Sequence, residues 1–194
     1  MSDDRWMVVG LGNPDHGYGG TRHNVGRDVL DVLVGRHHAS LSRNKKVGAD
    51  VDEVRVGGER VVLVRPGTYM NNSGGPVQQT AAWYRVPPER IVVIYDEIDL
   101  EVGELRVKQG GGNNGHNGLK DLDLRLPSTG YHRVRVGVGR PPGRMAVKDH
   151  VLRRFDPQER EVIDIVVQHA ADAVECLVAE GLAETQNRHN GSVV

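Results

Sequence analysis

His23 is the residue of this sequence whose side chain is best suited to proton transfer near neutral pH. It lies in the segment Thr21-Arg22-His23-Asn24, a short distance after the apolar run Met7 to Val9 and the glycines Gly10 and Gly12. An imidazole titrates near neutrality, so it can act as a general base toward water. A lone histidine is more often structural, so a catalytic role needs support from other residues.

Asp96 is the carboxylate best placed to orient this histidine. The run Ile91 to Ile94 is continuously apolar, as in a strand buried on both faces, and Tyr95-Asp96-Glu97 follows it. Asn13 follows the first apolar run in the same way. Ligands of open α/β sheets bind beyond the carboxyl ends of parallel strands, so these two strand ends predict one crevice in which Asp96 reaches His23. The alternative is that Asp96 only caps a turn or a helix.

Two further loops carry side chains that could face the same crevice. Thr68 to Ser73 leads from a strand into a helix and contains Asn71 and Asn72, while residues 110 to 118 read GGGNNGHNG. The glycines allow positive φ and a close approach of the backbone to a ligand, which favours a ligand-binding loop. The Walker A and dinucleotide-binding patterns are both incomplete here.

The elements that must position these residues are strands alternating with helices. Strands are expected at 7–9, 51–56, 59–64, 91–94, 105–108 and 134–139, and helices at 25–34, after 73 and at 119–126. Gly57-Gly58 is a hairpin signal, so part of the sheet is antiparallel. Asp156-Pro157-Gln158-Glu159 is a capping box that opens a long amphipathic helix ending near Gly181. The polar residues from about 183 predict a frayed tail.

The whole chain sets the class of protein. Its 194 residues, 38% hydrophobic and 26% charged, suit a single globular domain. We find no signal peptide and no transmembrane segment, so we expect a cytoplasmic protein without a membrane partner. The single cysteine, Cys176, excludes an internal disulfide. The HExxH zinc motif and the G-x-S-x-G nucleophile elbow are both missing, which disfavours metal and acyl-enzyme chemistry.

The net charge of −1 hides a strong segregation of charge. Residues 133–154 contain seven basic residues and one acid, a net charge of +6, whereas residues 155–194 carry −6. Such asymmetry indicates a face that binds an anion, although a solvated basic surface is an equally good interpretation of the charge alone.

Separated motifs in the chain also resemble the bacterial peptidyl-tRNA hydrolase family. They are Gly10-Leu11-Gly12-Asn13-Pro14, Thr21-Arg22-His23-Asn24, Thr68-Tyr69-Met70-Asn71, Tyr95-Asp96-Glu97 and Gly115-His116-Asn117-Gly118. The resemblance runs from Val8 to about Phe155. It implies an α/β fold in one domain, with a mixed twisted sheet between layers of helices, and hydrolysis of the ester that joins a peptide to the terminal ribose of tRNA. It further implies no metal and no cofactor, and we expect a monomer.

The resemblance also assigns roles to residues. His23 becomes the catalytic base and Asp96 its partner. The expected substrate-binding residues are Asn13, Tyr18, Tyr69, Asn71, His116 and Asn117. Lys108 and Arg133 are expected to contact tRNA phosphates. Ester hydrolysis explains why histidine, aspartate and asparagine occur here. A base activates water, a carboxylate orients the base, and neutral amides stabilise the oxyanion.

The sequence departs from the family pattern at three positions. Asp15 and Asn114 replace frequent glycines, and Arg27 replaces an apolar aromatic residue. Asp15 brings an unexpected negative charge toward an anionic substrate. Two other functions stay open: an RNA-binding module without catalysis, which would not need His23 and Asp96, and a hydrolase of small esters, which would not need the basic segment.

Overall fold

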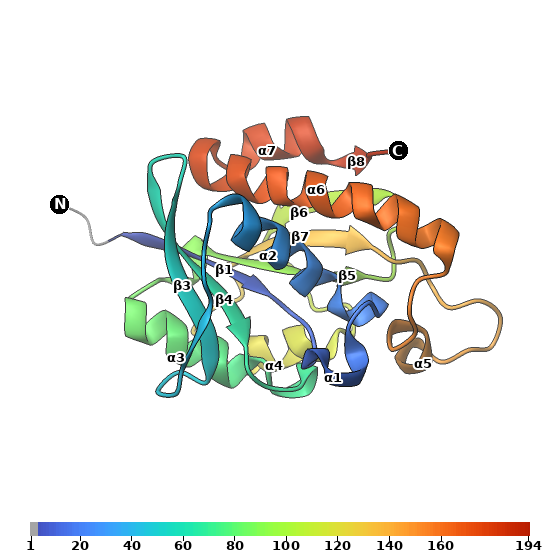
Figure 1. Ribbon diagram of the computed structural model, residues 1–194, viewed down its shortest axis with the longest axis horizontal. Helices are drawn as coiled ribbons and strands as arrows, with labels where there is room; N and C mark the ends of the chain where they lie inside the picture. Colours follow the sequence, from blue (N-terminus) through green and yellow to red (C-terminus); the bar gives the residue numbers. More distant parts are fainter. Residues whose placement is uncertain (1–3) are drawn as a thin grey trace.

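Four parallel strands form the centre of the sheet in this computed structural model, which describes residues 4–194. The described residues make one eight-stranded sheet in the order β2-β3-β4-β1-β5-β7-β6-β8 (Figure 1). The parallel strands are β4 (Glu59–Pro66), β1 (Arg5–Gly10), β5 (Ile91–Glu97) and β7 (His132–Gly137). The antiparallel strands are β2 (Ser42–Asn44), β3 (Ala49–Val56), β6 (Glu104–Gln109) and β8 (Gly191–Ser192). The predicted mixed sheet is therefore confirmed.

Helices cover both faces of this sheet. One face carries α2 (Val25–Arg36), α6 (Pro157–Glu180) and α7 (Leu182–His189), and the other carries α3 (Gly74–Tyr84) and α4 (Asn117–Arg125) (Figure 1). The short elements are α1 (Asp15–Tyr18), α5 (Val147–Val151), η1 (Arg22–Asn24), η2 (Met70–Asn72) and η3 (Pro88–Arg90). The predicted three-layer α/β/α arrangement is confirmed.

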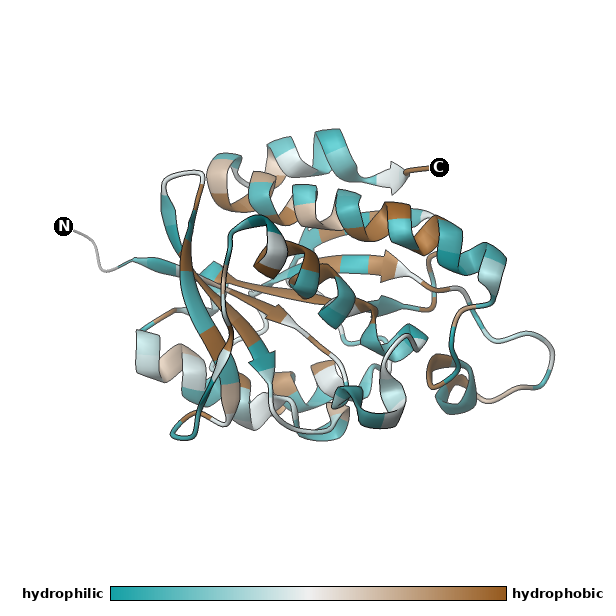
Figure 2. Cartoon of the chain, viewed as in Figure 1, coloured by the Kyte–Doolittle hydropathy of each residue, from teal (hydrophilic) through white to brown (hydrophobic). Residues whose placement is uncertain are grey.

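Each face of the sheet has its own apolar core. Successive strand residues point to opposite faces, so Val8 joins the cluster under α2 and α6 while Met7 and Val9 join the cluster under α3 and α4. All of β5 is buried, as its unbroken apolar sequence predicted. Figure 2 shows the same pattern, with hydrophobic central strands and hydrophilic outer faces on the helices. The central strands are therefore fixed from both sides.

The local signals for the hairpin and the long helix are confirmed. Gly57 and Gly58 have φ values of 56° and 82°, which a two-residue turn between β3 and β4 requires. The Asp156 carboxylate accepts a hydrogen bond from Glu159 N at 2.8 Å, and the Glu159 carboxylate accepts one from Asp156 N at 3.1 Å. Helix α6 ends at Glu180, directly before Gly181.

The expectation of a frayed tail is wrong. Residues 182–189 form α7, and β8 pairs with β6. Side chains connect this segment to the same strand, because Asn190 Oδ1 accepts from Val107 N at 2.7 Å and Gln186 Nε2 donates to Val107 O at 3.0 Å. These contacts satisfy the backbone of an edge strand, and polarity along the sequence does not reveal them.

No helix among residues 4–194 combines the length and the apolar character needed to cross a bilayer.

Candidate active site

The predicted site residues surround a cavity of about 480 Å³ at the carboxyl ends of the parallel strands. Asn13 follows β1, Asp96 lies at the end of β5, and Tyr69 and Asn71 follow β4. The fourth parallel strand, β7, leads toward α5, which lines the cavity as well. The crevice was predicted from the ends of two strands, and the segments at the ends of four parallel strands form it.

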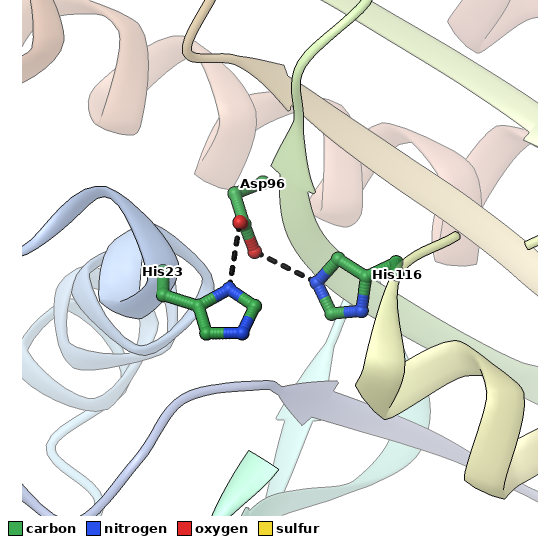
Figure 3. Close-up of side chains that lie close together, drawn as sticks. All are labelled: His23, Asp96 and His116. Carbon is green, nitrogen blue, oxygen red and sulfur yellow. Dashed lines mark hydrogen bonds and ion pairs between the residues drawn. The ribbon is translucent and has the colours of Figure 1, made fainter. Parts of the chain in front are cut away.

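A close contact between helix α2 and strand β5 brings His23 to Asp96. A Cβ atom on Gly26 would lie 2.2 Å from the carbonyl oxygen of Ile94, so only glycine allows this approach. His23 precedes that contact by one helical turn, and Asp96 follows Ile94 by two residues. His23 Nδ1 lies 2.8 Å from Asp96 Oδ2, and both side chains are buried (Figure 3). The predicted contact is present.

Asp96 also binds a second histidine. His116 Nε2 lies 2.8 Å from Asp96 Oδ1, so the two imidazoles occupy different oxygens of one carboxylate (Figure 3). His116 is the N-cap of α4, where its Nδ1 accepts from the backbone N–H of Gly118 at 3.1 Å and of Leu119 at 3.3 Å. Both ring nitrogens of His116 are therefore occupied. His116 also lines the cavity, so its predicted part in substrate binding stays a prediction, while its ring nitrogens bind Asp96 and the start of α4.

This hydrogen-bond pattern determines which nitrogens carry protons. Two N–H donors face His116 Nδ1, so the proton of the neutral ring is on Nε2 and is donated to Asp96. His23 donates its Nδ1 proton to the other carboxylate oxygen. The lone pair of His23 is consequently on Nε2, at the cavity it helps to line. This is the tautomer that a general base requires.

The charge of Asp96 controls the titration of His23. Burial disfavours the imidazolium, but the charge of Asp96 and its hydrogen bond outweigh that penalty and raise the pKa of His23 above its ordinary value. Burial also opposes ionisation of Asp96. The two imidazoles nevertheless hold the pKa of Asp96 well below its usual range. Asp96 is thus a permanent carboxylate beside a base that titrates above ordinary histidine.

His23, Asp96 and His116 are also a group of potential metal ligands, whose donor atoms lie within 4.8 Å of one another. Coordination through His116 Nε2 would require a free lone pair there and a proton on Nδ1. Nδ1 instead accepts from two backbone N–H groups of α4. The arrangement therefore suits a hydrogen-bonded pair of histidines better than a metal centre.

Asn13 is held rigidly from two sides. Asn24 Oδ1 accepts from Asn13 N at 2.9 Å, and Asn24 Nδ2 donates to Asn13 O at 3.0 Å. Asn13 Oδ1 accepts from Met70 N at 2.7 Å, which connects the loop after β1 with the loop after β4. The Nδ2 group of Asn13 makes no hydrogen bond within residues 4–194 and remains available to a ligand. Asn24 precedes α2 as its N-cap residue, but its side chain makes no cap hydrogen bond and positions Asn13 instead.

The remaining predicted substrate-binding residues also line the cavity. Tyr18 and Tyr69 meet edge to face, with ring centroids 6.1 Å apart, and form one wall. Asn71 and Asn117 are exposed amides on that lining. The structure thus places Tyr18, Tyr69, Asn71 and Asn117 at the cavity, as predicted, but their part in binding stays a prediction.

Sequence reasoning missed the wall formed by α5. Val147, Lys148, Val151 and Leu152 line the cavity. His150 Nε2 lies 2.9 Å from Gly139 O, which joins α5 to the start of the basic loop at 139–146. The apolar spacing within 147–152 was a usable signal, although the segment is too short to show a helical period.

Two of the three departures from the family pattern interact. Arg27 is buried and its Nη2 donates to Pro66 O at 2.7 Å, below the loop after β4. Asp15 is exposed, and its Oδ1 lies 4.0 Å from Arg27 Nη1. Burial lowers the pKa of Arg27, and the charge of Asp15 opposes that shift. The extra negative charge of Asp15 thus has a cation beside it.

The prediction that Arg133 contacts a phosphate is wrong. Its side chain is 0% exposed, and its guanidinium donates to Gly112 O at 2.8 Å and to Gly111 O at 2.7 Å. Arg133 therefore supports the glycine-rich loop from below. Lys108, on the neighbouring strand, is partly exposed, as is Arg135 on the same face as Arg133. Strand periodicity places both arginines on one face but cannot show which one the loop covers.

Fold and site together define an α/β protein with a buried histidine–aspartate pair suited to general-base hydrolysis. Known proteins make the assignment specific. The family model for peptidyl-tRNA hydrolase matches residues 7–194. The chain is 48% identical to the peptidyl-tRNA hydrolase of Frankia alni over 188 residues, which cover 97% of this chain and 95% of that protein. It is 52% identical to that of Leifsonia xyli over 185 residues, covering 94% and 95%.

A solved structure of a peptidyl-tRNA hydrolase has the same fold as this chain. The peptidyl-tRNA hydrolase from Acinetobacter baumannii superposes with a TM-score of 0.91 at 34% identity, covering 99% of this chain and 97% of that one. The chain belongs to the peptidyl-tRNA hydrolase family, whose members hydrolyse the ester bond of peptidyl-tRNA. Membership in a family of hydrolases decides against an RNA-binding module without catalysis.

Proposed function

We propose that this chain hydrolyses the ester between a peptide and the 3′-terminal ribose of tRNA, with His23 as general base. The observation that carries the proposal is the 2.8 Å contact between His23 Nδ1 and Asp96, which leaves Nε2 unprotonated at the cavity. Such a base takes a proton from water as the water attacks a carbonyl carbon. Asp96 then stabilises the imidazolium that forms.

The bonds and protons balance without any further group. The water oxygen bonds to the ester carbon, and its proton passes to His23 Nε2. When the carbon–oxygen bond to the ribose breaks, the imidazolium returns that proton to the departing ribose oxygen. The products are free tRNA and a peptide carboxylic acid, which loses the second proton of the water molecule to solvent. The reaction needs neither a cofactor nor a metal in this proposal.

Amide donors at the cavity suit the negative charge that develops on the carbonyl oxygen. Asn13 Nδ2 is available and fixed in place, because both the backbone and Oδ1 of Asn13 are bound. Asn117 lies directly after His116 and presents a second amide on the lining. Neutral donors stabilise an oxyanion without adding a competing charge near the phosphates.

We assign the phosphate contacts to Lys108 and Arg135. The paired strands β6 and β7 place both side chains on the same face. Partial burial and the charges of Arg135 and Arg133 lower the pKa of Lys108, so these cations repel one another and a bound anion would relieve the repulsion. Arg135 lies 3.9 Å from Glu97, which lines the cavity, so a stem phosphate would sit beside the reaction centre.

The biological setting follows from this substrate. Peptidyl-tRNA arises in translation, so we infer a cytoplasmic enzyme that meets the acceptor stem and 3′ end. We also infer that a monomer is sufficient, because one chain supplies every residue named for the site.

Replacing His23 with alanine tests the proposal. We expect turnover to fall about 10²- to 10⁴-fold, because the general base is lost. Binding of peptidyl-tRNA should change little, since Lys108 and Arg135 remain. Single-turnover hydrolysis and equilibrium binding of the same substrate measure the two effects. Near-normal hydrolysis by folded His23→Ala protein would refute the mechanism.

A further inference from the structure

Asn114 has an unusual backbone conformation at the edge of the cavity. Its φ is +48°, and among residues 4–194 the other non-glycine residues with positive φ are His38 and Arg85. Glycine would adopt this conformation without strain, so a side chain retained here must contribute something else. The function proposed above gives it no part.

The Asn114 side chain connects the glycine-rich loop to the end of β5. Its Nδ2 donates to Glu97 Oε2 at 2.9 Å and also contacts the Asp99 carboxylate. Glu97 is 6% exposed, and Asp99 N contacts the same oxygen at 3.3 Å. A buried carboxylate needs such donors, so Asn114 satisfies Glu97 as well as fixing the loop.

Asp99, which Asn114 contacts, also binds the basic loop at 139–146. Arg140 Nε donates to Asp99 Oδ1 at 2.6 Å, and Arg135 lies 3.9 Å from Glu97. The charged groups that face Asn114 are thus Glu97 and Asp99, each accompanied by an arginine. Asn114 is the neutral donor between the two carboxylates, and it is two residues from His116.

Other contacts hold the rest of this loop, and within the turn before His116 the Asn113 Oδ1 and O atoms accept from Gly115 N at 3.0 Å and His116 N at 2.9 Å. Asn114 connects this turn to Glu97 at the end of β5. Arg133 binds the carbonyls of Gly111 and Gly112, and Asn113 Nδ2 donates to Asp123 Oδ2 at 3.3 Å. His116 itself contacts Asp96 from the end of the loop. Loss of the Asn114 contacts would therefore loosen the loop at the position that determines how His116 meets Asp96.

We propose that Asn114 is a positioning residue of this active site, whose side-chain amide binds the glycine-rich loop to the end of β5 and holds His116 against Asp96. This inference rests on the proposed function of His23 and Asp96. When His116 is held, it donates a proton to Asp96 and shares the carboxylate with His23. When it is released, Asp96 acts on His23 alone and favours the imidazolium more strongly.

Substitution of Asn114 by glycine is the first test. Glycine suits the positive φ, which offsets part of the stability lost with the hydrogen bond to Glu97, so the protein should stay folded. The value of kcat/KM should drop about tenfold, the factor that one hydrogen bond to a carboxylate contributes. The acid limb of the pH profile should move to higher pH. The control is His38→Gly, a second positive-φ residue, which lies at the far end of α2 and should keep full activity.

The second test exchanges the hydrogen-bond donor and acceptor between positions 114 and 99. Asn114→Asp places a third carboxylate against Glu97 and Asp99, so it should be less active than Asn114→Gly. Adding Asp99→Asn restores an amide–carboxylate pair and should recover part of the activity. Absence of recovery in the double variant would contradict a direct contact between the two side chains.

An NMR titration of His23 and His116 separates this proposal from the proposed function, because it requires no turnover. We expect a higher pKa of His23 in Asn114→Gly than in the wild type, and faster amide exchange in residues 110–118. Unchanged titration and exchange would overturn the positioning role even if the enzyme hydrolyses peptidyl-tRNA. An inactive wild type would refute the function while these two measurements still decide the role of Asn114.

Discussion

Asp96 determines which histidine nitrogens carry protons, because each of its two oxygens accepts a hydrogen bond from a different histidine. An amide cannot imitate this arrangement, since it offers one acceptor and one donor. His116 must keep donating from Nε2, because α4 occupies its Nδ1. An asparagine at 96 would therefore turn its donor toward His23 and leave the proton of His23 on Nε2, where it prevents base catalysis.

We accordingly expect Asp96→Asn to lower kcat by about 10³- to 10⁴-fold, as a histidine in the wrong tautomer would. Removing His116 as well frees the asparagine to rotate and to accept from His23 Nδ1. The double variant Asp96→Asn, His116→Ala should therefore be faster than Asp96→Asn alone, although slower than wild type. Steady-state kinetics on the wild type, Asp96→Asn, His116→Ala and the double variant measure this, with thermal unfolding as a control for the lost N-cap of α4. A double variant no faster than the single one would contradict the tautomer argument.

The pH dependence of turnover should report the same pair. A general base works when neutral, and Asp96 raises the pKa of His23 above the ordinary value of 6.5. Activity should therefore rise with pH along an acid limb whose midpoint lies above 6.5. In Asp96→Asn the carboxylate charge is gone and burial dominates, so the limb of the residual activity should move to lower pH. An acid limb with the same midpoint in the wild type and in Asp96→Asn would exclude His23 as the titrating group.

At the scale of elements, the packing of helix α2 on β5 through Gly26 sets the distance between His23 and Asp96. Gly26→Ala should destabilise the protein by about 1–3 kcal/mol, because its Cβ would meet backbone that cannot move aside. Gly35→Ala is the matched control: it lies in the same helix, and its Cβ would meet no atom within 4 Å. That substitution should be neutral or stabilising by about 0.5–1 kcal/mol. Urea unfolding measures both, and equal stabilities would contradict the close packing of α2 on β5.

The sequence contains the signals for much of this architecture. Ile91 to Ile94 indicated a strand buried on both faces, and its last residues placed Asp96 at the cavity. The capping box at Asp156 fixed the start of α6. These signals succeed because they are local: a run of apolar side chains or a cap acts within a few residues of itself.

The parts that sequence could not provide depend on contacts between distant segments. Arg133 and Arg135 alternate correctly on β7, yet only the path of the loop at 110–118 decides which is buried. The second partner of Asp96 was hidden because His116 acts both as a cap and as a donor. The order in residues 182–192 arises from side chains that bind β6, which polarity alone does not show.

At the scale of the whole molecule, the strong charge segregation acts through fewer residues than the sequence suggested. Arg133 is buried under the glycine-rich loop, and Arg140 is paired with Asp99. Arg135 lies 3.9 Å from Glu97, whereas Arg144, Lys148, Arg153 and Arg154 are exposed. The total of +6 therefore overstates the charge available to tRNA.

Affinity for peptidyl-tRNA should fall with salt at a log–log slope of about −0.9 for each phosphate contacted on duplex. Lys108→Ala and Arg135→Ala should each flatten this slope by about one contact, with a smaller effect on kcat. Arg133→Met should keep the slope but lower stability, since it leaves two loop carbonyls without donors. Binding measured across a salt series tests all three, beside a peptidyl ester without the stem. Equal efficiency on the stemless ester would favour a hydrolase of small esters.

The pairing of residues 182–192 with β6 has a consequence for how separate molecules behave. A strand at the margin of a sheet offers unpaired N–H and C=O groups that can recruit a strand from a second chain. Here Asn190 and Gln186 occupy both backbone groups of Val107, and β8 covers the residues before it. This edge of the sheet is therefore closed to edge-to-edge association, and variants that detach α7 should aggregate more readily than the wild type.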